Sequence, residues 1–192
     1  PIATLLGTTK IPSFSGTALA AYRYSRKTPI NLRLFLFLFP AAFIGAGLGA
    51  WCITIVDESF IKPFILIVLV LIAIYSFFKK DFGILKTKNI EEKKQVLIGS
   101  IFGFIIGFYD GLIGPGTGSF FIICFVVFVG FDFITANANA KTLNLATNLS
   151  AIGIFAATNN ILYHLAIPMA LCNMAGAYIG SKLALLRGNR FI

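Results

Sequence analysis

The chain is predicted to fold as an all-α, polytopic membrane protein, and three observations support this. Hydrophobic residues make up 58% of the 192-residue sequence and charged residues only 12%, against about 25% charged in a typical soluble domain. The apolar residues gather in runs of about 20, the length that a helix needs to cross the hydrocarbon layer. The 21 Phe and 18 Gly suit helices that pack closely on one another. We expect a single transmembrane domain over residues 1–192.

The charged, Cys and His residues exclude several classes of protein. The net charge of +9 does not indicate nucleic-acid binding, because Lys and Arg stand in short runs at the edges of apolar segments, as in cytoplasmic loops. Cys52, Cys124 and Cys172 are far apart and lie in apolar runs, without metal-binding or disulfide spacing. His164 is the sole histidine, which excludes a bis-histidine haem and a histidine-cluster metal site. We expect no cofactor.

Three spans are predicted in the first half from apolar length and flanking charge. They cover about residues 3–24, 32–56 and 60–78, and a basic loop, residues 79–94, follows. Aromatic residues near the span ends, among them Tyr24, are expected at the membrane interface.

The second half begins with two shorter apolar arms, residues 96–111 and 117–130. Each arm is below the usual spanning length, which favours a re-entrant hairpin or a pair of short tilted helices. A polar-striped helix over 137–157 and a last span over 165–186 follow.

The segment between the arms, GFYDGLIGPGTGS, interrupts the apolar run with a carboxylate, five glycines and a proline. Irregular backbone at membrane depth survives only where it is buried in protein or lines a wet cavity. The segment therefore indicates a pathway or a binding site. The alternative is a tight turn between helices, in which Gly and Pro serve geometry alone.

An internal repeat is predicted at an offset of 131 residues. It aligns polar and glycine positions without a gap, pairing Lys10 with Lys141, Ser13 with Asn144, Thr17 with Asn148, Gly45 with Gly176, and Gly49 with Gly180. The repeats would cover about 1–80 and 95–192. On this offset the first copy of the hairpin would fall before residue 1, and a final span would follow residue 192.

Loop charges predict that the two repeats have inverted topology. The loop over residues 23–33 holds four basic residues, whereas its mate over 154–164 holds no Lys or Arg. A change of sign between repeats is what inverted topology requires. The loops at 23–33, 79–94 and 187–190 are then cytoplasmic, and the hairpin enters and leaves the membrane on that side.

Polar side chains at helical spacing form the first candidate binding surface. Asn137, Lys141, Asn144 and Asn148 share one helix face, and Lys10, Ser13 and Thr17 repeat that face in the first half. Two lysines among amide and hydroxyl groups would suit a small anion with oxygens on several sides. Alternatively, these side chains bond neighbouring helices, or the lysines extend to the interface.

The hairpin supplies the second set of candidates. Backbone N–H groups at Gly116 and a helix N-terminus, with the hydroxyls of Thr117 and Ser119, could face an anion. Asp110 could titrate and couple proton movement. It could instead be structural, as an ion-pair partner of Lys141 or a cap for the second arm.

Small residues four apart form two further motifs, Gly45–Gly49 and Gly176–Gly180. This spacing is typical of close helix packing, so we expect these glycines to pack helices and not to bind a ligand.

Three segments together resemble the TauE/SafE sulfite-exporter-like (TSUP) permease family, in its YfcA-like branch. They are GFYDGLIGPGTGSF, ANANAKTLNLATNLS and GAYIGSKLAL, and the first-half LGTTKIPSFSGT resembles the family's lysine-containing helix. The resemblance implies a multi-pass permease of the cytoplasmic or inner membrane, with two homologous halves, that moves small sulfur-containing or organic anions. By position, the resemblance implies that the hairpin motif contains Asp110, Gly111, Gly114, Pro115, Gly116 and Ser119. It also implies that the paired lysines of the family are Lys10 and Lys141.

The hypothesis from sequence is a secondary transporter, not an enzyme, that binds a small anion near mid-membrane between the repeats. Its partners are the anion, the lipid bilayer and, as a further candidate, a coupling proton. The alternatives are a non-transporting membrane subunit or sensor and, less favoured, an intramembrane enzyme. An enzyme would need paired carboxylates or a nucleophile with a base, and one internal Asp with one edge His supplies neither.

Overall fold

The structure is a computed structural model that describes residues 1–26, 28, 30–57, 59, 61, 63, 65–67, 70 and 90–187. Most of the predicted third span and most of the basic loop at 79–94 lie outside the described residues. Every regular element in the described part is helical, which confirms the predicted all-α class. The helices are α1 (Ile2–Ser25), α2 (Leu32–Ile55), α4 (Glu92–Leu112), α5 (Thr117–Cys124), η1 (Phe125–Val129), α6 (Phe133–Ala157) and α7 (Tyr163–Arg187).

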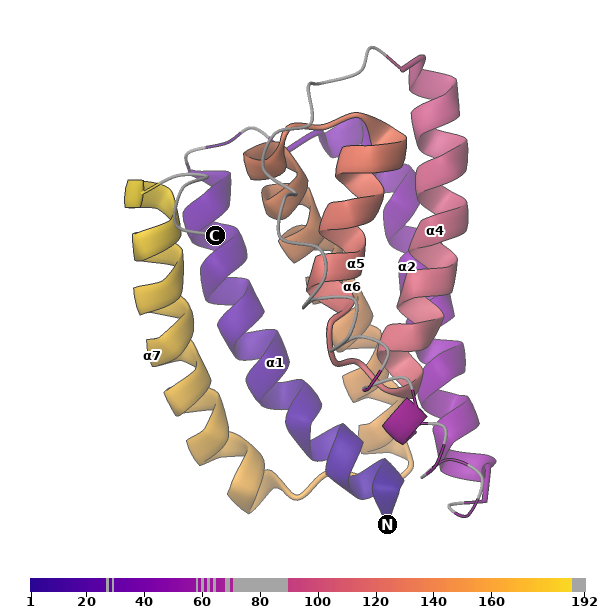
Figure 1. The fold of residues 1–192 in the computed structure, drawn as a ribbon. Helices are drawn as coiled ribbons and strands as arrows, with labels where there is room; N and C mark the ends of the chain where they lie inside the picture. The colour runs from indigo at the N-terminus through magenta and orange to yellow at the C-terminus, as the bar shows by residue number, and fades with distance from the viewer. Residues whose placement is uncertain are drawn as a thin grey trace.

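The helices stand side by side in an elongated bundle (Figure 1). Helix α2 packs chiefly on α4, and α1 packs on α7. Helix α6 contacts both α1 and α2 and so joins the two pairs, with α5 packed on it from the other side. This arrangement places α6, the predicted polar-striped helix, at the centre of the molecule.

The two arms form a helical hairpin that leaves and returns at the same end of the bundle (Figure 1). The expectation of two short arms is wrong for the first of them, because α4 has 21 residues. The helix continues through the charged residues Glu92, Lys93 and Lys94, which extend it beyond the apolar segment. Helices α2 and α4 are the two described helices that are long and apolar enough to cross a membrane.

Helices related by the 131-residue offset run in opposite directions. Figure 1 shows α1 ascending and α6 descending, and likewise α2 descending and α7 ascending. An inverted repeat requires this arrangement. The repeat itself stays a prediction.

Glycines bring α2 and α4 into backbone contact. A Cβ at Gly49 would overlap the carbonyl oxygen of Phe108, and one at Gly111 would overlap that of Ala46. The predicted role of Gly45–Gly49 in helix packing is therefore confirmed. By contrast, a Cβ at Gly176 or Gly180 would meet nothing within 4 Å among the described residues.

Two apolar clusters hold the bundle together. One lies between α2, α4, α5 and α6 and includes Leu38, Phe121 and Leu143. The other lies between α1, α2 and the far end of α6 and includes Leu6 and Phe155. Lipid tails are as apolar as these side chains, so in a membrane the clusters hold α6 in place through close van der Waals packing.

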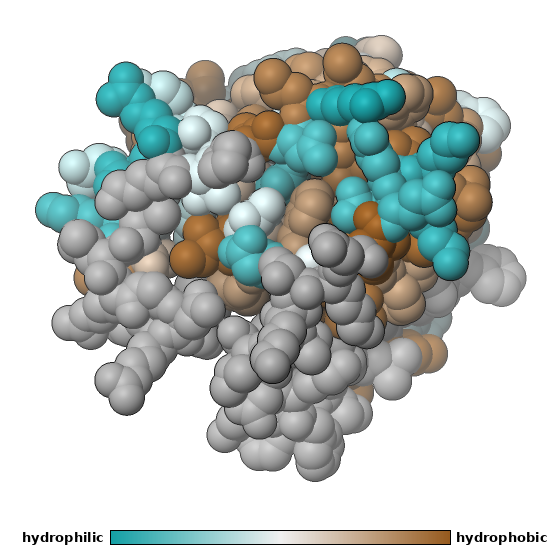
Figure 2. All heavy atoms as spheres, turned by 90° about the horizontal axis from the view of Figure 1, so that it is seen from above, coloured by the Kyte–Doolittle hydropathy of each residue, from teal (hydrophilic) through white to brown (hydrophobic). Residues whose placement is uncertain are grey.

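The upper end of the bundle in Figure 1 is charged. Figure 2 views this end and shows hydrophilic residues in two groups, with hydrophobic residues around them. Arg23 and Arg26 end α1 here, and Arg33 lies 3.1 Å from Glu92 across the start of α2 and α4. The predicted cytoplasmic loop at 23–33 lies at this end, although its placement in the cytoplasm stays a prediction.

Asp132 caps the first turn of α6. Its Oδ1 accepts hydrogen bonds from the backbone N–H groups of Ile134 and Thr135, both at 3.0 Å. Partial burial raises the pKa of Asp132, but these hydrogen bonds outweigh it and hold the pKa below its ordinary value. The stabilisation is therefore full above the unfolded pKa of about 3.9 and is lost as the pH falls through the lower folded pKa.

Asp132→Ala is expected to destabilise the protein by about 1 kcal/mol at neutral pH, because it leaves two N–H groups of α6 without an acceptor. Thermal unfolding in detergent measures the change, and Asp132→Asn, which keeps an acceptor oxygen, is the control. The difference between wild type and Asp132→Ala should narrow in strong acid. An equal loss in both variants would show that the charge, and not the cap, is what matters.

Candidate functional site

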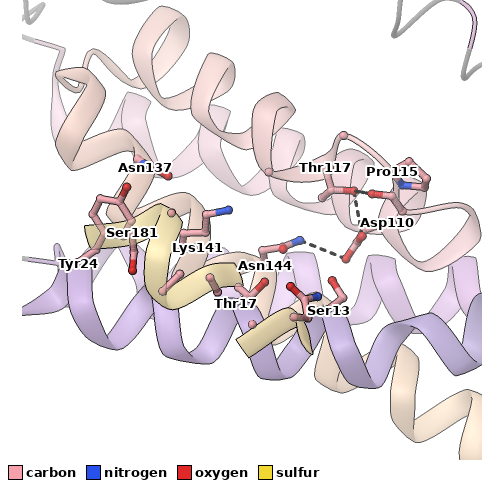
Figure 3. Close-up of a pocket in the computed structure, with 18 residues that line it drawn as sticks. Ser13, Thr17, Tyr24, Asp110, Pro115, Thr117, Asn137, Lys141, Asn144 and Ser181 are labelled. Atoms are coloured by element: carbon pink, nitrogen blue, oxygen red, sulfur yellow. Dashed lines mark hydrogen bonds between the residues drawn. The ribbon is translucent and has the colours of Figure 1, made fainter. Parts of the chain in front are cut away.

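A polar cavity of about 560 Å³ lies between α1, the α4–α5 turn, α6 and α7. Hydroxyl, amide and charged side chains from α1, α4, α5, α6 and α7 face it (Figure 3). Its polar lining consists of Ser13, Thr17, Tyr24, Asp110, Thr117, Asn137, Lys141, Asn144, Asn173 and Ser181. A polar space of this size at the centre of an apolar bundle is the expected form of a ligand site.

Asp110 is the buried acid of the site, and its partner is Lys10. The carboxylate Oδ1 lies 3.0 Å from Lys10 Nζ, and the two residues are 2% and 4% exposed. The ammonium also donates to the backbone carbonyl of Asp110. The predicted ion pair with Lys141 is therefore wrong, because the hairpin turn places Asp110 against α1.

Two further groups satisfy the Asp110 carboxylate. The hydroxyl of Thr117 lies 2.9 Å from Oδ1, and Asn144 donates from Nδ2 to Oδ2 at 3.4 Å (Figure 3). A buried charge is tolerated only when its partners are present in this way. Asp110 thereby joins α1, the hairpin and α6 at one point.

The turn between α4 and α5 depends on glycine for its backbone and for space. Gly114 and Gly116 have φ values of +94° and +83°, which side-chain-bearing residues rarely adopt. A Cβ at Gly114 would also lie 3.0 Å from Lys10 Nζ. The hydroxyl of Tyr109 closes the turn by donating to the carbonyl of Pro115 at 2.6 Å.

Lys141 is the second cation of the cavity, and it differs from Lys10. Its side chain extends from α6 into the cavity and points toward the hairpin (Figure 3). The ammonium lies 3.6 Å from the position a Cβ would take at Gly118, in the first turn of α5. None of the described residues pairs with it by a hydrogen bond or an ion pair.

The structure brings most of the predicted site residues together, but not all. Ser13, Thr17, Asp110, Gly116, Thr117, Asn137, Lys141 and Asn144 line the cavity. Lys10 lies behind it, paired with Asp110. Ser119 is exposed outside it. Asn148 is fully buried one turn below, where its Nδ2 donates to the carbonyl of Asn144 at 2.7 Å.

Three polar lining residues were not predicted. Tyr24 was expected at the membrane interface, which is wrong, because it is buried and lines the cavity. Asn173 donates from Nδ2 to the carbonyl of Pro12 at 2.9 Å, and its Oδ1 fills the space that Gly16 leaves. Ser181 is buried on α7. The one available signal was that Asn173 and Ser181 are polar residues inside an apolar span.

A bundle of apolar helices around a polar cavity with a buried ion pair is typical of membrane transporters. Within the described residues, no three His, Cys, Asp or Glu side chains come together in a group that could hold a metal ion. The lining offers hydroxyl and amide groups, one ammonium and one carboxylate.

The chain belongs to the TauE/SafE sulfite exporter family, whose sequence model matches residues 1–192. It is 34% identical to the probable membrane transporter protein ORF9 of Sinorhizobium sp, over 100% of this chain and 72% of that protein. It is 32% identical to a probable membrane transporter protein of Haemophilus influenzae, over 100% and 74%. It is 27% identical to the probable membrane transporter protein YfcA of Escherichia coli K12, over 99% and 70%. No solved structure matches the chain.

The family establishes the coarse function. The chain is a multi-pass membrane protein of a transporter family and not an enzyme. Its partners are accordingly a small-molecule substrate and the membrane lipid, as predicted.

Proposed function

We propose that the protein is a secondary transporter that binds a small sulfur-containing or organic anion in the cavity between α1, α5 and α6. The observation that carries this is Lys141, whose ammonium faces the cavity with no partner among the described residues. The description of the family as sulfite exporters supports the sulfur-containing class.

The surroundings of Lys141 favour an anion as its missing partner. An ammonium inside a membrane protein is costly without a compensating charge. Helix α5 starts beside it, at Gly116, with no side chain as cap, so the positive end of the helix dipole adds to the same region. Ser13, Thr17 and Asn144 supply hydroxyl and amide groups for the remaining oxygens of the anion.

We assign Asp110 as the candidate proton site of the same transporter. Its carboxylate lines the cavity and also holds Lys10 on α1. Protonation would remove the charge that fixes Lys10 and would loosen the contact between α1 and the hairpin. A proton could in this way be coupled to movement of the two proposed repeats, residues 1–80 and 95–192.

Lys141→Gln is expected to reduce transport about tenfold or more, because a hydrogen bond to a charged group contributes about 1.5–3 kcal/mol. The measurement is uptake of sulfite into proteoliposomes that contain the purified protein. Lys93→Gln removes the same charge from an exposed site on α4 and should transport normally. Saturable uptake that Lys141→Gln leaves unchanged would contradict the proposed site.

A further inference from the structure

We infer that the cavity selects an anion with a single negative charge and rejects a dianion of the same shape. The inference rests on the proposed function and goes further, because it names the charge of the substrate. It follows from the charged side chains that line the cavity and from whether each of them already has a counter-charge.

The lining carries two charged side chains of opposite sign, Asp110 and Lys141. Asp110 is already compensated, since Lys10 Nζ lies 3.0 Å from its carboxylate and both side chains are buried. Arg23 is outside the lining, and its guanidinium lies 4.3 Å from the centre of the Tyr178 ring. Among the described residues, the cavity therefore offers one uncompensated positive charge.

With Asp110 ionised, the Lys10–Asp110 ion pair is neutral and supplies no positive charge to a ligand. The selection therefore applies to this state, and not to the protonated state of Asp110 proposed above. In the ionic form the Asp110 carboxylate also faces the cavity and would repel a second negative charge on the ligand.

A dianion would then carry one negative charge without a counter-charge. An uncompensated charge in a site removed from bulk water is strongly unfavourable, whereas a fully paired one is tolerated. A monoanion leaves the site neutral when it pairs with Lys141. The charge balance therefore favours the monoanion independently of the shape of the ligand.

The amide of Asn137 is a neutral polar group that could bind the uncharged part of the ligand. Asn137 is 6% exposed, lines the cavity one turn from Lys141, and its Oδ1 is buried without a hydrogen-bond partner in the described part of the chain. Buried amide groups rarely remain unpaired. A ligand that reaches both residues would pair its charge with Lys141 and donate a hydrogen bond to Asn137 Oδ1.

The test compares methanesulfonate with sulfate, which are both tetrahedral and close in size but carry one and two negative charges at neutral pH. Binding to the purified protein is measured by calorimetry at constant ionic strength. We expect methanesulfonate to bind about tenfold or more tightly than sulfate. Sulfate binding as tight or tighter would overturn the inference while leaving an anion transporter in place. Binding of neither anion would overturn the anion site and the proposed function together.

A charge added inside the cavity provides a second, independent measurement. Thr17→Lys places a second positive charge in the lining and is expected to raise sulfate affinity relative to methanesulfonate by about tenfold. Ser25→Lys adds the same charge at the exposed end of α1, outside the cavity, and should leave the ratio unchanged. An equal change of this affinity ratio in both variants would overturn the inference. The ratio would then depend on the net charge of the protein and not on the charge inside the cavity.

Discussion

Replacing Asp110 with Ala is expected to lower the free energy of unfolding by about 3–5 kcal/mol, the usual cost of removing one partner from a buried ion pair. Lys10, which is 4% exposed, would keep its bond to the Asp110 backbone carbonyl but lose its counter-charge. Thr117 and Asn144 would lose the carboxylate but keep the Gly114 carbonyl and the Thr147 hydroxyl, respectively, as acceptors. The measurement is the unfolding midpoint in detergent.

The double variant Lys10→Met with Asp110→Ala is the decisive control. Most of the cost of Asp110→Ala arises from the buried charge that remains, so removing that charge as well should restore much of the stability. The recovery should be incomplete, because Ala at position 110 leaves unfilled space in a buried site. Losses that simply add in the double variant would show that Lys10 and Asp110 do not stabilise each other.

The helices of this chain were predictable because hydropathy is a local property. The predicted spans over 3–24, 32–56 and 165–186 end within three residues of α1, α2 and α7. The first arm was predicted too short, because the charged turn at Glu92 was assigned to the loop. Apolar length marks the part of a helix that lipid covers, whereas the helix itself can continue into the aqueous layer.

The partner of Lys10 was not predictable from the same patterns. The repeat offset equates Lys10 with Lys141, which suggested that the two lysines have equal roles. The structure separates their roles, since the α4–α5 turn lies against α1 and places the carboxylate of Asp110 on Lys10, whereas Lys141 has no hydrogen-bond or ion-pair partner among the described residues. Which lysine meets the acid depends on how the hairpin packs, and this is a tertiary property that no local spacing encodes.

The asparagines of α6 also show which part of the site could not be predicted from sequence. Helical spacing placed Asn137, Asn144 and Asn148 on one side of α6, and all three are buried. The cavity ends at Asn144, however, and Asn148 instead bonds to the backbone of its own helix. Periodicity predicts the direction of a side chain, but the depth of a cavity depends on the neighbouring helices.

Gly49→Ala is expected to have the second large effect, through the contact between α2 and α4. The added methyl would overlap the Phe108 carbonyl oxygen and lie 2.8 Å from the backbone nitrogen of Leu112. Both obstacles are backbone atoms, which cannot rotate away, so the two helices must separate. Overpacking costs about 1–3 kcal/mol, and we expect the upper part of that range.

Gly153→Ala is the matched control, because a Cβ at Gly153 on α6 meets nothing within 4 Å among the described residues. In the middle of a helix, Ala is intrinsically favoured over Gly by about 1 kcal/mol, so this variant should be neutral or slightly more stable. The measurement is thermal unfolding of both variants in the same detergent. Since α4 also carries Asp110, separation of α2 from α4 should reduce transport by Gly49→Ala as well. Unchanged stability of Gly49→Ala would mean that the two helices do not meet at these glycines, and the position of Asp110 in the cavity would lose its support.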